Sequence, residues 1–115
     1  LDGEAFNFGP DSQQDLSVQG LIDAMASRWP GAGWQEGEDP DGAGREATLL
    51  RLSCDKALRV LGWRAVLQLP TTVEMTVDWY RRWRDGDPDL HGYTTMQIEQ
   101  YTEVARSAGL SWSTG

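Results

Sequence analysis

The segment between residues 69 and 86 most constrains the fold, because it places apolar side chains on two sides of a predicted helix. One stripe is formed by Val73, Val77 and Tyr80, and the other by Met75, Trp79 and Trp83. A helix that lies on the surface of a protein is apolar along one stripe only. We therefore expect this helix to pack between two layers. Thr71 and Glu74 have the spacing of a capping box at its start.

Three further segments have the apolar spacing of helices. The first covers Ser17–Trp29. A short helix follows Ser53, which is predicted as its N-cap, and ends before Gly62, a residue suited to the left-handed conformation after a helix. The last helix is predicted to start at a second capping-box pair, Thr94 and Gln97.

Short runs bounded by turn residues predict three strands, at Ala5–Phe8, Gly33–Gln35 and Thr48–Leu52. Residues 36–44 combine four acids, three glycines and a proline, which predicts a loop. The order of elements predicts a mixed α/β fold with a small sheet built from the strands near Phe6 and Leu50. The helices near Leu21 and Val77 are expected to pack on that sheet.

Length and charge narrow the class of protein. With 115 residues the chain is one domain at most. Its net charge of −8 argues against nucleic acid or an anionic membrane as a partner, and no apolar run approaches the roughly 20 residues that span a bilayer. The lone Cys54 excludes an internal disulfide and agrees with a cytoplasmic location. Because the chain starts at Leu1 and not at a methionine, we expect it to be part of a longer protein.

The sequence lacks the residues that several kinds of metal, cofactor and catalytic site require. Cys54 and His91 are the only members of their kinds, so no metal site is predicted. The glycines near Gly31 have the wrong spacing for a dinucleotide-binding turn and follow a predicted helix. Short-chain dehydrogenases use a tyrosine with a lysine four residues later, but Lys56 is the only lysine and Leu52 stands four residues before it. No catalytic residue is therefore predicted.

Asp55-Lys56-Ala57 and Leu61-Gly62-Trp63 are two short patterns that follow each other in the chain. Together they resemble the C-terminal part of the extended short-chain dehydrogenases, the family of NAD-dependent nucleotide-sugar epimerases and dehydratases. Four further segments narrow the resemblance: Glu4 to Pro10, Glu46-Ala47 with Leu50 to Cys54, Thr76 to Tyr80, and Gln97 to Tyr101. They resemble the CDP-glucose 4,6-dehydratases within that family. The resemblance runs from Gly3 to about Tyr101, with Arg45, Ser53 and Asp55 departing from the usual family residues.

The resemblance implies that residues 1–108 are the C-terminal lobe that binds a nucleotide sugar, with CDP-glucose as the expected substrate. Residues 109–115 are expected to be a disordered tail. The N-terminal Rossmann domain, which holds NAD and the catalytic residues, would lie outside this chain. We expect the lobe to contact that domain in the longer protein, and the chain alone to self-associate, to be inactive and to hold no NAD.

The resemblance places the substrate contacts at Asn7 to Pro10 and Arg45 to Ala47, and the site residues expected from it are Asn7, Arg45 and Glu46. A cation beside a glycine-rich loop suits recognition of a diphosphate, and a carboxylate suits sugar hydroxyls or the base. Ordinary surface charge explains Arg45 and Glu46 equally well. Two alternative functions stay open: binding of another nucleotide sugar by a sister epimerase or dehydratase, and a non-catalytic interaction module.

Overall fold

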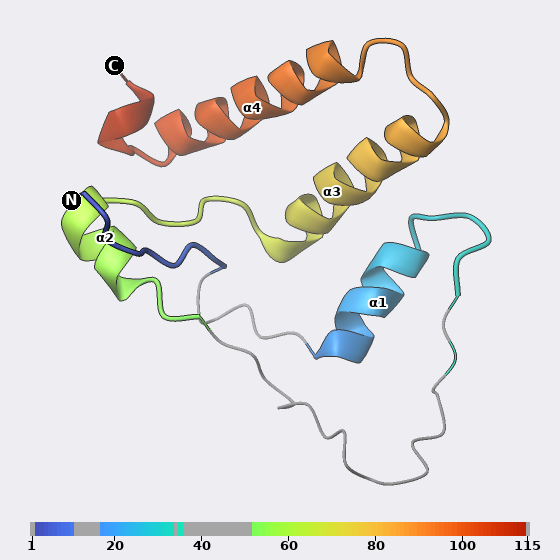
Figure 1. Ribbon diagram of the computed structural model, residues 1–115, viewed down its shortest axis with the longest axis horizontal. Helices are drawn as coiled ribbons and strands as arrows, with labels where there is room; N and C mark the ends of the chain where they lie inside the picture. The colour runs from blue at the N-terminus through green and yellow to red at the C-terminus, as the bar shows by residue number, and fades with distance from the viewer. Residues whose placement is uncertain (1, 11–16, 34, 36–51, 115) are drawn as a thin grey trace, which may run out of the picture.

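The computed structural model describes residues 2–10, 17–33, 35 and 52–114. Over these residues the structure is helical, with no strand. The elements in chain order are α1 (Val18–Ala26), α2 (Asp55–Leu61), α3 (Leu69–Arg84), α4 (Leu90–Ser107) and the 3-10 helix η1 (Ser111–Ser113). Figure 1 shows α3 and α4 as a helical hairpin, with α2 beside the N-terminal stretch of the chain.

Helix α3 occupies the centre of the helical arrangement, because it packs against α4 on one side and against α1 on another. Val73 and Val77 are buried, and Val77 has no exposed surface at all. The prediction that this helix has packing partners on two sides is therefore confirmed for the described residues. Its stripes are not fully covered, since Tyr80 and Trp83 remain 49% and 61% exposed.

Two side-chain hydrogen bonds join α3 to α4. The indole Nε1 of Trp79 donates to Thr94 Oγ1 at 2.8 Å, and Gln97 Nε2 donates to the carbonyl oxygen of Met75 at 2.8 Å. Thr94 and Gln97 were predicted to open a helix, and that prediction is wrong. The helix begins one turn earlier, where the Asp89 carboxylate accepts a hydrogen bond from the N–H of Gly92 at 3.1 Å.

Polar contacts at the end of α1 hold it against α3. Arg28 forms an ion pair with Glu74 at 3.3 Å, and Arg81 Nη1 donates to the carbonyl oxygen of Arg28 at 3.4 Å. The α1 helix starts where predicted, with the Ser17 hydroxyl accepting from the N–H of Gly20. It ends at Ala26, earlier than the periodicity indicated, because the next residues form tight turns.

The C-terminal residues fold back onto α4. Leu110 and Ser113 are buried, and the Trp112 ring stacks on Tyr101 with 6.1 Å between the ring centroids. The expectation of a disordered tail is therefore wrong for the residues of η1. A tryptophan and a leucine supply the apolar area that a short polar tail would lack.

The predicted sheet is absent from the described residues, so the α/β fold class is wrong. Ala5–Phe8 belongs to no strand, and neither Gly33 nor Leu52 does. Thr48 to Arg51 lie outside the described residues. The stretch around Asn7 does lie beside Ser53, as the sheet required. Side chains make these contacts in place of a backbone ladder, and a strand needs the ladder.

Two predicted helix caps are also wrong. The residue that precedes α2 is Cys54, not Ser53, and its side chain makes no capping bond. Helix α3 starts at Leu69 after Gln68, with Pro70 in its first turn and no side-chain cap. Gly62 is confirmed as the residue after α2, with a φ of 64° in the left-handed region. A β-carbon is disfavoured in that conformation, which is why glycine ends the helix.

Asp87 organises the turn between α3 and α4. Its carboxylate accepts from the N–H of Asp89 at 2.9 Å and pairs with the Arg82 guanidinium at 2.6 Å. That guanidinium lies over the ring of Tyr93, 4.0 Å from its centroid. The backbone hydrogen bond, and then the bond from Arg82, lower the pKa of Asp87 below its usual value.

We predict that Val77→Ala lowers the free energy of unfolding by about 2 kcal/mol, because it removes two buried methyl groups and leaves a cavity. Urea denaturation followed by circular dichroism at 222 nm measures the change. Val18→Ala is the matched control, since Val18 is 57% exposed. Equal losses in the two variants would contradict the central position of α3.

A second prediction concerns the stability of the chain at acidic pH. The lowered pKa of Asp87 means that its stabilisation is present above the unfolded-state pKa, about 3.9, and is lost as the pH falls through the folded-state pKa. Asp87→Asn should therefore destabilise the chain at pH 6 and have a smaller effect at pH 3. Thermal unfolding midpoints at both values test this. A difference between the two proteins that grows on acidification would refute it.

Candidate functional site

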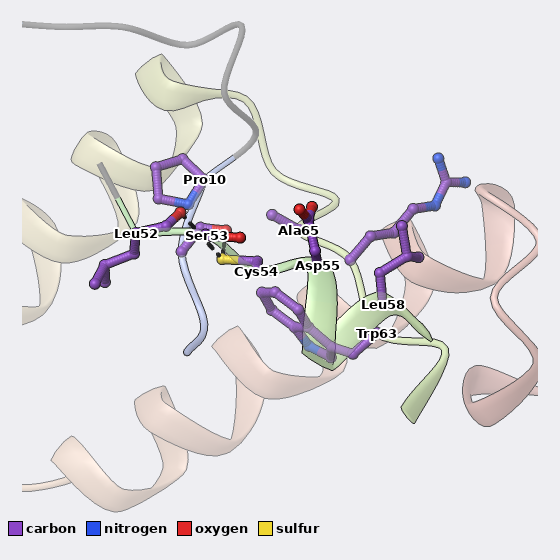
Figure 2. A pocket seen from close by; sticks show the side chains of 10 residues that line it. Pro10, Leu52, Ser53, Cys54, Asp55, Leu58, Trp63 and Ala65 are labelled. Atoms are coloured by element: carbon purple, nitrogen blue, oxygen red, sulfur yellow. Dashed lines mark hydrogen bonds between the residues drawn. The ribbon is translucent and has the colours of Figure 1, made fainter. Parts of the chain in front are cut away.

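A cavity of about 490 Å³ lies where three separate stretches of the chain meet. Its walls come from Gly9–Pro10, from the stretch that leads into α2 together with Asp55 and Leu58 of that helix, and from the stretch that follows α2. Figure 2 shows the side chains that converge on it. The lining residues are Gly9, Pro10, Leu52, Ser53, Cys54, Asp55, Leu58, Trp63, Arg64 and Ala65.

Lys56 anchors the N-terminal stretch to α2 and so sets the position of one wall. Its Nζ donates to the carbonyl oxygen of Ala5 at 3.0 Å and pairs with the Glu4 carboxylate at 3.1 Å. The same ammonium lies 4.6 Å from the ring centroid of Phe6. One half-buried lysine thus contacts three residues in a row. This explains how an extended segment keeps its place without a sheet.

Two further contacts join the same walls. Asn7 Nδ2 donates to the carbonyl oxygen of Ser53 at 3.4 Å. The Cys54 thiol lies 3.8 Å from the carbonyl oxygens of both Gly9 and Leu52. A thiol is a weak donor, so the thiol acts mainly as a small packed group on the cavity wall.

The indole of Trp63 forms the aromatic part of the cavity. Gly62 reverses the chain after α2. The backbone N–H of Trp63 then donates a hydrogen bond to the carbonyl oxygen of Ala57 at 3.2 Å. The ring meets Phe8 edge to face, with 4.9 Å between centroids. Phe8 is not among the residues that line the cavity, so this contact fixes the indole and leaves part of it open to the cavity.

The cavity has one acidic and one basic side chain. Asp55 is exposed, and its carboxylate makes no ion pair or hydrogen bond to another described residue. Arg64 Nη2 donates to the carbonyl oxygen of Ala108 at 3.1 Å, which ties this wall to the end of α4. The guanidinium keeps further N–H donors, because it has five in all.

Ser53 and Cys54 would need a base within hydrogen-bond reach to act as nucleophiles. The residues that line the cavity include no histidine, lysine or tyrosine, and the Asp55 carboxylate makes no hydrogen bond to either side chain. Across the described part of the chain, no three His, Cys, Asp or Glu side chains gather closely enough to hold a metal ion. None of the helices in that part is long and apolar enough to cross a membrane.

The three predicted site residues are only partly placed. Asn7 is not among the residues that line the cavity but contacts Ser53, which is, whereas Arg45 and Glu46 lie outside the described residues. The sequence analysis did not predict that Asp55 and Trp63 line a cavity. It named them only as parts of the two short patterns that resemble the family. The left-handed Gly62 is the signal that points to Trp63, because the chain must turn back there.

The comparisons with known proteins give one curated relative. No known family profile matches the chain, and no solved structure does. A CDP-glucose 4,6-dehydratase of Salmonella typhimurium (strain LT2) is 33% identical over 100 residues, which cover 85% of this chain and 27% of that enzyme. The chain therefore spans about a quarter of the length of the curated relative it matches. The match supports a distant relation between this chain and the C-terminal region of that dehydratase.

Proposed function

We propose that this chain is the substrate-binding part of a longer enzyme of the CDP-glucose 4,6-dehydratase type. The observation that carries the proposal is the match to a dehydratase of that name over 85% of the chain. The cavity is consistent with it, because an aromatic ring, a carboxylate and a guanidinium are the groups that recognise a nucleotide sugar. CDP-glucose is the proposed ligand.

The chemistry of such an enzyme would belong to the rest of the longer protein. In such an enzyme NAD would supply the reversible oxidation of the sugar that accompanies dehydration, and the residues that hold it would belong to the Rossmann domain. The described residues do not form a Rossmann site for NAD, since they include no strand and such a site holds the diphosphate on a strand, a glycine-rich turn and a helix in succession. The part proposed for this chain is to hold and orient the nucleotide sugar.

Three side chains are proposed to contact the substrate. Asn7 is bonded to Ser53 of the cavity wall, and its amide has a second N–H to offer a sugar or phosphate oxygen. Arg45 is proposed to pair with the diphosphate, since a guanidinium matches two phosphate oxygens at once. Glu46 is proposed to accept hydrogen bonds from sugar hydroxyls.

We predict that the 115-residue chain binds CDP-glucose in isothermal titration calorimetry at 0.15 M salt. Arg45→Ala should weaken binding by about tenfold or more, because charge-assisted hydrogen bonds to phosphate contribute roughly 1.5–3 kcal/mol. Arg106→Ala is the matched control. It removes the same charge from an ion pair with Glu103 on α4.

Three outcomes would count against this proposal. One is the absence of any heat of binding with CDP-glucose. Another is an equal effect of the two arginine variants, which would remove Arg45 from the site. The third is formation of the 4-keto-6-deoxy product when the chain alone is incubated with CDP-glucose and NAD, because the proposal assigns no catalytic step to this chain.

We also propose that the isolated chain self-associates through the open side of α3. Tyr80 and Trp83 are 49% and 61% exposed there, and a groove between α3 and α4 runs beside Tyr80. Large aromatic rings that are exposed to water favour association with a second copy of the chain, which would bury them. In the longer protein, the same surface is proposed to face the Rossmann domain.

Sedimentation velocity tests self-association directly. We expect a dimer or larger species at micromolar concentration, and a shift toward monomer in Trp83→Gln, because that change removes the largest exposed ring of α3. Val18→Thr, an apolar-to-polar change at an exposed site on α1, should leave the distribution as it is. A wild-type chain that sediments as a monomer at high concentration would refute the proposal.

A further inference from the structure

We infer that the cavity between Gly9–Pro10 and α2 is the subsite for the cytosine base, and that Asp55 is the residue that selects it. The inference rests on the proposed function and names the part of the nucleotide sugar that this cavity takes. In this arrangement the pyrimidine ring lies against Trp63. Its amino group donates a hydrogen bond to the Asp55 carboxylate.

Trp63 is positioned to receive a flat ring. The indole is half-buried and is held from outside the cavity by the edge-to-face contact with Phe8. The hydrogen bond from the backbone N–H of Trp63 to the carbonyl oxygen of Ala57 fixes the main chain at Trp63. Aromatic side chains bind nucleobases by stacking, and a fixed indole loses little freedom when it does so. Figure 2 shows the ring among the residues that line the cavity, below Cys54 in this view.

Asp55 supplies the selection between bases. Most described carboxylates of this chain are engaged by an arginine or lysine; those in ion pairs are Glu4, Glu74, Asp78, Asp85, Asp87 and Glu103. Asp55 lines the cavity without such a partner. An ionised carboxylate only accepts hydrogen bonds. It therefore suits the N4 amino group of cytosine and opposes the O4 carbonyl oxygen of uracil.

The size and surroundings of the cavity agree with a base and its ribose. A volume of about 490 Å³ falls within the range of small-molecule sites. Arg64 lines the same cavity with donors beyond the one used by Ala108, and these suit ribose or phosphate oxygens. Asn7, proposed above to contact the substrate, is attached to the wall at Ser53. In the proposed arrangement the base lies in the cavity, and the rest of the nucleotide sugar lies next to it.

The test compares CDP-glucose with UDP-glucose by calorimetry, using the 115-residue chain and its Asp55→Asn variant. We expect the wild-type chain to prefer CDP-glucose. The preference should fall by about tenfold in Asp55→Asn, because an amide donates as well as accepts and so tolerates the uracil carbonyl. Asp85→Asn makes the same chemical change away from the cavity and should leave the preference intact.

A second readout follows the indole directly. The Trp63 indole signal in a nitrogen–proton correlation spectrum is identified by its loss in Trp63→Phe. It should move on addition of CDP and stay in place on addition of glucose 1-phosphate. The Trp29 indole, which lies over Arg84 at the α1–α3 junction, should respond to neither.

The outcomes separate this inference from the proposed function. Binding of CDP-glucose with an unchanged base preference in Asp55→Asn overturns the base subsite alone. A Trp63 signal that stays in place while CDP-glucose saturates the chain does the same. A chain that binds neither nucleotide sugar overturns the proposed function, and this inference with it.

Discussion

The packing of α3 on two of its sides is the constraint on which the rest of the helical arrangement depends. Helices α1 and α4 each contact α3 and are not otherwise joined by comparable packing, while η1 is attached through α4. The buried area is small, since the fully buried side chains are no larger than Val77. Directional contacts therefore carry much of the specificity. The Trp79–Thr94 and Gln97–Met75 bonds fix the position of α4, and a hydrogen bond specifies geometry in a way that apolar contact does not.

The sequence predicted the helices well and their partners poorly. The apolar stripe through Val73 and Val77 identified the central helix, because the buried face of a helix places apolar residues at helical spacing in the sequence. The sheet was predicted wrongly because Ala5–Phe8 has the residue pattern of a strand. Pairing depends on a neighbour with free backbone groups, which local pattern does not reveal. The capping pair Thr94 and Gln97 was misread for a related reason: the same polar side chains serve equally well between helices.

The candidate site was predictable only in part. Asn7 was expected from the family resemblance, and it contacts Ser53, one of the residues that line the cavity. Asp55 and Trp63 come from either end of a short helix, and only the turn at Gly62 shows that both belong to one cavity. Sequence spacing identifies residues on one face of one element. It has less to say about a site whose walls come from three stretches, as this one does.

The cavity also differs from the helical hairpin in the length of chain that must be closed to form it. The bonds that join its walls link residues 45 to 51 positions apart, whereas Trp79 and Thr94 are only 15 apart. Closing a longer loop costs more chain entropy, and contacts distant in sequence tend to form late. The hairpin of α3 and α4 therefore closes the shorter loop. The cavity walls are joined across the longer one by contacts that include the ammonium group of Lys56, and a ligand bridging those walls would act as one more cross-link between them.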